Sequence, residues 1–191
     1  MLELHGRAMR HSVVIVATIH DDQWELPTPC ATWTVRDLLA HMTTENRGFA
    51  AAARGETESR AAWEARPFSA DPRRDYAESA DEVLTAFASA APEFWLPNIH
   101  ETVRFPAAKA MGFHLLDYVV HSWDVAAALG RTIALEDDLV AAAQEVADAD
   151  VPDNERRRRP GAGFQPAVET EETDPLSRLL AFLGRDPKWK V

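Results

Sequence analysis

The chain has 191 residues, of which 46% are hydrophobic, and this length and composition are typical of one folded domain rather than a disordered chain. Its formal net charge of −11 argues against nucleic acid or an anionic membrane surface as a partner, and no apolar run approaches the roughly 20 residues that a membrane-spanning helix needs. The single cysteine, Cys30, excludes an internal disulfide, and the N-terminus has no apolar signal segment, so we expect a cytoplasmic protein.

The first part of the chain is expected to form two helices, over residues 4–20 and 34–54, separated by a segment whose two prolines exclude a regular helix. The second helix has the clearer start. Thr34 and Asp37 have the spacing of a capping box, in which each side chain bonds a backbone N–H of the first turn. Gly55 is typical of the turn that ends a helix, and the apolar stripe between these signals predicts packing in the core.

The rest of the chain is also expected to be mostly helical. Apolar residues at helical spacing predict four further helices, over residues 75–90, 106–129, 136–149 and 176–183. Residues 56–74 are expected to form a loop with a helical turn near Trp63, and residues 93–105 a structured connection without strands. Residues 151–174, rich in Pro, Arg and Glu, are expected to lie extended on the surface, with the basic run 156–159 in solvent.

These expectations describe an all-α bundle, because no convincing strand alternation and no internal repeat is found. Residues 1–150 are expected to form the bundle. Residues 151–191 are expected to form an extended linker and a short C-terminal helix that packs on the bundle within the same domain. The connecting loops differ in length, which is common in helical bundles.

The helix expected over residues 106–129 carries an unusual group of polar residues. At about 100° per residue, His114, Asp117, His121 and Asp124 fall within an arc of roughly 80°. Their neighbours are apolar, so this helix is expected to be mostly buried. Burying carboxylates and imidazoles costs several kcal/mol unless the groups are paired or bind a cation, and that cost predicts a site.

Asp117 and His121 are four residues apart, a spacing that places two ligands over one point beside a helix. By itself such a pair is more often a structural hydrogen bond. His41, beside the apolar stripe of the second helix, is the candidate third ligand, although a lone His there is more often a core residue. Two histidines and a carboxylate from two core helices would form a metal site with coordination positions open to water or substrate. Both interpretations stay open on this pattern alone.

Three segments of the chain carry a family resemblance. Residues 27–41 read PTPCATWTVRDLLAH, residues 117–124 read DYVVHSWD and residues 179–189 read LLAFLGRDPKW. Together they resemble an actinobacterial family, known mainly as uncharacterised proteins, that is related to the N-terminal domain of mycothiol-dependent maleylpyruvate isomerase. That domain is a DinB-like four-helix bundle.

The resemblance implies a DinB-like fold and a metal held by His41, Asp117 and His121. The isomerase has Glu where Asp117 stands, so this chain's carboxylate is shorter by one methylene. The isomerase also carries a further C-terminal domain, for which no segment is expected here. Maleylpyruvate isomerisation itself is therefore not expected.

Two further residues of the same helix have open interpretations. His114 is a fourth ligand, a partner that orients the ligands, or a plain core residue, and we favour the last two. Asp124 is expected to cap the helix or pair locally, with Arg36 or Arg104 as the nearest candidates in the pattern, and to fix the ring tautomer of His121.

Other residues near these segments have weaker signals. Asn46 and Arg47 lie one turn beyond the candidate third ligand, where they either meet an anionic substrate or lie in solvent. Trp33 is expected to make a staple-like contact at the start of its helix. Cys30 is expected to be a small buried residue rather than a catalytic thiol, because the sequence places no base near it. His5 has no partner at a useful spacing and is expected to be an ordinary residue.

Two functional hypotheses follow from this pattern. The first is a metal-dependent enzyme, a thiol transferase or isomerase acting on a small molecule with a low-molecular-weight thiol of the mycothiol type. Its divalent metal would be zinc by ligand type, with nickel or iron as alternatives, and would lower the pKa of the thiol. The second is a non-catalytic bundle in which a metal or polar cluster is structural and the domain serves for binding or dimerisation. A homodimer is open in either case.

Overall fold

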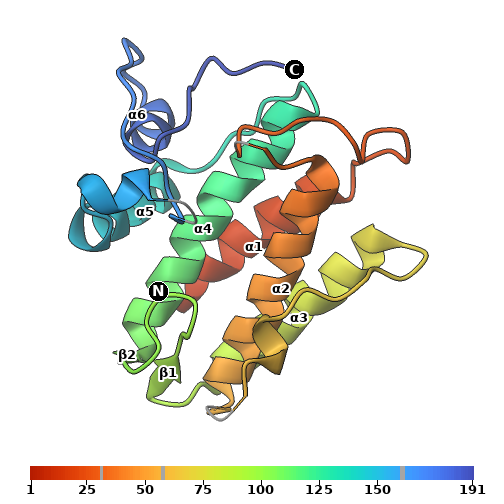
Figure 1. Ribbon diagram of the computed structural model, residues 1–191, viewed down its shortest axis with the longest axis vertical. Coiled ribbons are helices and arrows are strands. Elements are labelled where there is room, and N and C mark those ends of the chain that lie inside the picture. Colours follow the sequence, from red (N-terminus) through yellow and green to blue (C-terminus); the bar gives the residue numbers. More distant parts are fainter. Residues whose placement is uncertain (31, 57–58, 160–161) are drawn as a thin grey trace.

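The computed structural model describes residues 1–30, 32–56, 59–159 and 162–191. Within them the chain forms an all-α fold with one small hairpin. The elements are α1 (Leu2–Val16), α2 (Val35–Ala53), α3 (Pro72–Ala88), β1 (Glu93–Trp95), β2 (Arg104–Pro106), α4 (Ala107–Ala128), α5 (Asp137–Asp150) and α6 (Pro175–Phe182). Helices α1 to α4 lie side by side as a bundle, in which α4 contacts both α1 and α2 (Figure 1). The expected bundle is confirmed.

Helix α2 begins as its sequence predicts. The Thr34 Oγ1 atom accepts a hydrogen bond from the Asp37 backbone N–H at 3.2 Å, and the Asp37 carboxylate accepts one from the Thr34 backbone N–H at 3.0 Å. The helix ends before Gly55, whose φ of 81° is accessible to glycine at little cost. These local signals fix the helix that carries His41.

Helix α3 starts three residues earlier than predicted, at Pro72 rather than at Asp75. The loop expected at Pro72 is instead the first turn of a helix, where proline is well tolerated because its missing N–H has no partner to lose. Asp71 caps the helix by accepting a hydrogen bond from the Arg73 backbone N–H. The helical turn predicted near Trp63 is present as a 3-10 helix (Ala61–Trp63).

The connection before α4 contains the antiparallel strands β1 and β2, which the sequence analysis did not predict. Phe94 pairs with Phe105 across the hairpin, and the Phe94 side chain is buried. Each strand has three residues, which is too short for a period of two to stand out in the sequence. The hairpin contacts both α2 and α4 and closes one end of the bundle (Figure 1).

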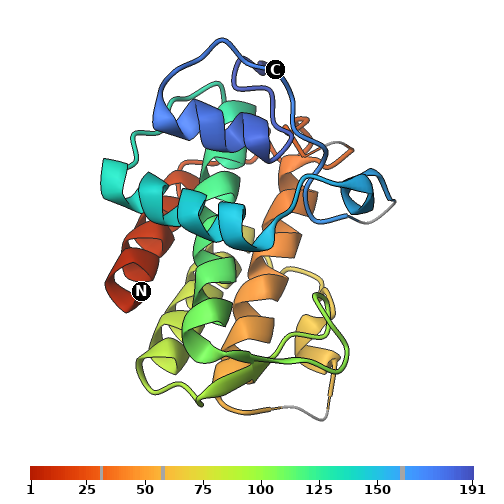
Figure 2. The same cartoon turned by 90° about the vertical axis from the view of Figure 1, so that its left-hand side faces the viewer.

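Helix α5 packs against α4, and α6 packs against α5, as the layering in Figure 2 shows. The segment between them is largely extended but includes a 3-10 helix (Glu155–Arg158). The expectation of a fully solvated basic run is wrong for Arg157, which is 4% exposed. Its guanidinium donates to the Phe182 carbonyl at 2.7 Å and to the Asp153 carboxylate at 3.0 Å, so it joins the two segments instead of facing solvent.

Packing between α2 and α4 positions the candidate site. Leu38, Leu39 and Met42 from α2 and Leu115 and Val119 from α4 are fully or almost fully buried. The Tyr118 hydroxyl on α4 donates a hydrogen bond to the Met42 carbonyl on α2 at 2.5 Å. Among the described residues no helix is long and apolar enough to cross a bilayer.

Candidate metal centre

The three candidate ligands meet between α2 and α4. Asp117 and His121 lie one turn apart on α4, and His41 faces them from α2. The Asp117 carboxylate lies 3.2 Å from His121 Nε2 through one oxygen and 3.7 Å from His41 Nε2 through the other. The three donor atoms all lie within 4.8 Å of one another. The fold therefore brings together residues that are 76 positions apart in the chain.

This donor set fits a single divalent cation. Ligand atoms at zinc distances of about 2.1 Å in a tetrahedral arrangement are roughly 3.4 Å apart, close to the separations of 3.2 and 3.7 Å found here. The His41 side chain is 28% exposed and that of Asp117 is 24% exposed, whereas His121 is 5% exposed. The site thus opens toward solvent on the side of His41 and Asp117, and three protein donors leave a position for an external ligand.

Charge ties Asp117 and His121 together. Burial would raise the pKa of Asp117, but the neighbouring imidazole of His121 outweighs burial and holds that pKa well below its usual range. Burial would lower the pKa of His121, but the Asp117 carboxylate raises it well above the ordinary value for histidine. A proton on His121 and a cation at its Nε2 atom are therefore alternative ways to neutralise Asp117.

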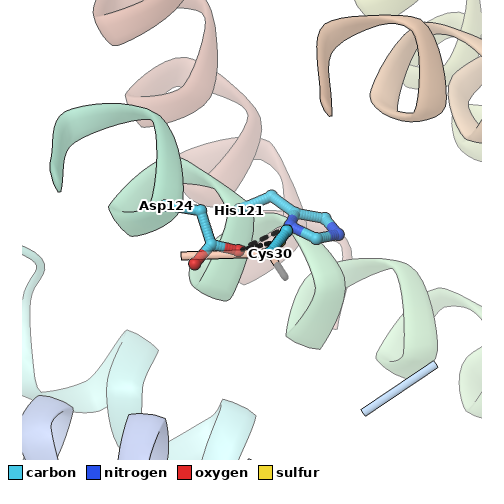
Figure 3. Close-up of side chains that lie close together, drawn as sticks. All are labelled: Cys30, His121 and Asp124. Carbon is cyan, nitrogen blue, oxygen red and sulfur yellow. Dashed lines mark hydrogen bonds and ion pairs between the residues drawn. The ribbon is translucent and has the colours of Figure 1, made fainter. Parts of the chain in front are cut away.

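The second ring nitrogen of His121 faces Asp124. His121 Nδ1 lies 2.8 Å from Asp124 Oδ2, and the Asp124 side chain is fully buried (Figure 3). Such a carboxylate fixes the ring orientation and leaves the other nitrogen free for a metal. The cation paired with Asp124 is Arg185, at 3.3 Å, and not Arg36 or Arg104 as the sequence pattern suggested. Burial would raise the pKa of Asp124, but Arg185 and His121 lower it.

Cys30 belongs to the same network, which no local pattern in the sequence indicates. Its Sγ atom donates to Asp124 Oδ2 at 2.9 Å and lies 3.7 Å from His121 Nδ1. Figure 3 shows the three side chains converging on one point. The imidazole beside Cys30 is that of His121, which is 91 residues away in the chain, whereas the sequence predicts no base near this cysteine. Only the tertiary fold brings the two together.

His114 is fully buried in the core and bonds another histidine. Its Nδ1 atom lies 2.9 Å from His5 Nε2, and its ring stacks on Tyr118 with the centroids 4.3 Å apart. His114 thus packs as a core residue, in line with one of the two favoured interpretations. His5, expected to be an ordinary residue, is its buried partner.

Residues around His41 on α2 fall on both sides of the helix. Asn46 is buried and donates to Ser79 at 2.9 Å, so it does not face the site. Glu45, which the sequence analysis passed over, has its pKa raised to about 7, chiefly by burial. The Trp33 ring lies 5.0 Å from the His41 ring, so the tryptophan expected as a staple packs against a candidate ligand. Glu45 is four residues after His41, and this spacing predicts that the two side chains lie on the same face of α2.

The bundle of packed helices with one small hairpin is the all-α architecture of the DinB-like class. The particular family is given by a model described as the mycothiol maleylpyruvate isomerase N-terminal domain, which matches residues 6–126. The match covers more than half of the chain, and this protein belongs to that family.

Similar proteins carry no further description of activity. Two uncharacterised proteins from two strains of Mycobacterium tuberculosis are each 30% identical to this chain, over 96% of its length and 97% of theirs. No solved structure matches. The resemblance seen in the sequence is thus confirmed at the level of the family.

Proposed function

We propose that His41, Asp117 and His121 bind one divalent cation. The observation that carries the proposal is the approach of three donor atoms from two helices to within 4.8 Å of one another. Two imidazole nitrogens and one carboxylate oxygen favour zinc, and nickel or iron(II) accept the same donors. Asp124 supports the site from behind by bonding the other nitrogen of His121.

We further propose that the protein is a thiol transferase or isomerase that acts on a small molecule with a low-molecular-weight thiol. A cation bound at this position would lower the pKa of a thiol that coordinates it. The part-exposed side of the site, at His41 and Asp117, gives a small thiol access, while buried His121 keeps its orientation. The name of the matching family, which includes mycothiol, favours a thiol of that type.

One observation favours a second function, that of a binding or dimerisation module with a structural polar cluster. Asp117 and Asp124 both pair with His121, and Asp124 also pairs with Arg185, so this part of the cluster is balanced by protein groups alone. A cluster satisfied in this way can stabilise the bundle without chemistry.

Metal content tests the first proposal directly. We expect about one equivalent of metal per chain in the purified parent protein and none in His121→Ala, measured by elemental analysis. His20→Ala is the matched control, because His20 is an exposed histidine away from the cluster, and it should keep the metal. A parent protein that takes up no zinc, nickel or iron, or a His121→Ala variant that keeps its metal, would contradict the proposal.

A second measurement separates catalysis from structure. If the ion is structural, chelation should lower the melting temperature markedly, because the binding free energy then contributes to folding. If the ion is catalytic, chelation should abolish consumption of a low-molecular-weight thiol in the presence of an electrophilic acceptor while the bundle stays folded. A metal-loaded protein that consumes no thiol with a panel of such acceptors would rule out the transferase.

A further inference from the structure

The segment after α6 enters the interior at Arg185. The chain turns at Gly184, whose φ is 81°, and a Cβ atom there would lie 2.7 Å from the Gln165 carbonyl oxygen. Only glycine fits this turn without displacing the neighbouring backbone. The turn directs the Arg185 side chain inward, where it is 5% exposed. A long cationic side chain is rarely buried to this extent unless it is paired.

Arg185 is paired with the group that orients His121. Its Nη2 atom donates to Asp124 Oδ2 at 3.3 Å and to Cys30 Sγ at 3.2 Å, and its Nη1 atom donates to the Leu183 carbonyl at 3.2 Å. Its Nε atom lies 3.5 Å from the other Asp124 oxygen. The guanidinium therefore contacts both carboxylate oxygens of Asp124, and such two-point pairing fixes the plane of a carboxylate as well as its charge.

A continuous chain of contacts leads from Arg185 to the candidate ligands. Arg185 holds Asp124, Asp124 holds His121 Nδ1 at 2.8 Å, and His121 Nε2 lies 3.2 Å from Asp117. An imidazole that donates from one nitrogen to a fixed carboxylate presents the other nitrogen unprotonated to a metal. The orientation of His121 as a metal ligand therefore depends on Arg185, which contacts none of the three candidate ligands.

We infer that Arg185 is a positioning residue for the metal centre, acting through Asp124 to orient the His121 ring. This inference rests on the proposed metal site. The contact with Arg185 also argues against a second cation at Cys30, His121 and Asp124, although their donor atoms lie within 4.8 Å of one another. The guanidinium already supplies the positive charge there, so a metal is directed to the Nε2 side of His121.

The test compares metal affinity in matched arginine variants of the full chain. Arg185→Gln keeps most of the side-chain volume and removes the charge. Arg178→Gln removes the same charge from the exposed face of α6 and serves as the control. With zinc and a competing chelator, we expect Arg185→Gln to bind about tenfold to a hundredfold more weakly than the parent, as is typical for groups that support a ligand. Arg178→Gln should bind as the parent does.

Two further variants separate positioning from a general loss of structure. Arg185→Lys keeps a charge near Asp124 and should recover part of the affinity. Because Arg185 acts through Asp124, the double variant Arg185→Gln with Asp124→Asn should bind zinc no more weakly than Asp124→Asn alone. Additive losses in the double variant, or parent-like affinity in Arg185→Gln, would overturn the inference.

A metal-free measurement keeps this inference distinct from the proposed function. Nitrogen-15 NMR of the His121 ring reports which nitrogen is protonated and how each is hydrogen-bonded. In the chelated protein, Arg185→Gln should shift the Nδ1 resonance of His121, whereas Arg178→Gln should not. An unchanged ring would overturn the positioning role, whereas a parent that binds no metal would count only against the proposed function.

Discussion

Helix α4 buries two histidines about two turns apart, and their surroundings give them opposite properties. As whole residues, His114 is 0% exposed and His121 is 4% exposed, so burial alone does not distinguish them. Burial and the neighbouring His5 hold the pKa of His114 well below its usual range. The carboxylate of Asp117 instead raises the pKa of His121 well above that range. Neighbouring charge, rather than depth, separates a core histidine from a candidate ligand.

His114 and His121 also differ in the hydrogen-bond partners of their ring nitrogens. His114 shares one proton with another neutral imidazole, His5, and stacks on Tyr118, so it serves packing. His121 bonds a carboxylate through each nitrogen. Both rings come from the polar arc of one helix, and the elements facing α4 decide which ring can bind a cation.

The largest expected effect comes from replacing each histidine by glutamine. His121→Gln should weaken zinc binding by at least about a hundredfold, because it removes a ligand and not merely a supporting group. His114→Gln should keep parent-like zinc affinity and lose about 1–3 kcal/mol of stability through its broken buried hydrogen bond. Chelator competition and urea unfolding measure the two quantities. Equal effects of the two variants on zinc binding would remove the distinction.

Acid should lower the free energy of unfolding through the buried pair of His5 and His114. Burial lowers the pKa of His5 to about 4 from an ordinary value of 6.5. Between these values the unfolded chain binds the proton and the folded chain does not, so stability is full above pH 6.5 and falls as the pH falls. At 1.36 kcal/mol per pKa unit, the loss by pH 4 is on the order of 3 kcal/mol.

Urea unfolding between pH 7 and pH 4 measures this loss in the parent protein. His5→Leu should reduce the pH dependence over that interval without abolishing it, because burial also lowers the pKa of His114. His20→Ala, which changes an exposed histidine, should leave it as in the parent. The same slope in His5→Leu and in the parent would show that the buried pair does not cause the loss.

The smallest expected effect tests whether stability and metal binding are separable on α2. Thr34→Ala removes a side-chain acceptor of the capping box, which typically costs about 1 kcal/mol. The cap lies two turns before His41 and contacts none of the three candidate ligands. The melting temperature should therefore fall by a few degrees with zinc affinity unchanged. A parallel loss of zinc affinity would indicate that fraying of α2 reaches the site.

Local signals in the sequence predicted most helices because caps and apolar spacing act within a few residues. The Thr34 capping box and Gly55 set the bounds of α2, and Gly130 follows the end of α4 with a φ of 64°. The hairpin was missed because three-residue strands carry no clear period. Pro72 predicts a loop by its residue type, although proline also occurs in the first turn of helices.

The candidate site was only partly predictable for a related reason. Asp117 and His121 share one helix, so their juxtaposition follows from helical geometry. The place of His41 beside the apolar stripe of α2 makes it a candidate, and the family resemblance supports its approach to the other two. Cys30 and Arg185 reach Asp124 across 94 and 61 residues of sequence, and no local pattern encodes contacts of that range.

The hydrogen bond between the Tyr118 hydroxyl and the Met42 carbonyl links the two ligand-bearing helices directly beside the candidate ligands. Sliding α4 along α2 by one residue is a displacement of about 1.5 Å. This displacement is enough to break the hydrogen bond and to leave the buried hydroxyl without an acceptor. The hydrogen bond therefore opposes small relative motions of the two helices near Asp117 and His41. A change in the spacing of the donor atoms therefore requires a sub-global opening of the bundle. The spacing should change only on the slow timescale on which core amides exchange.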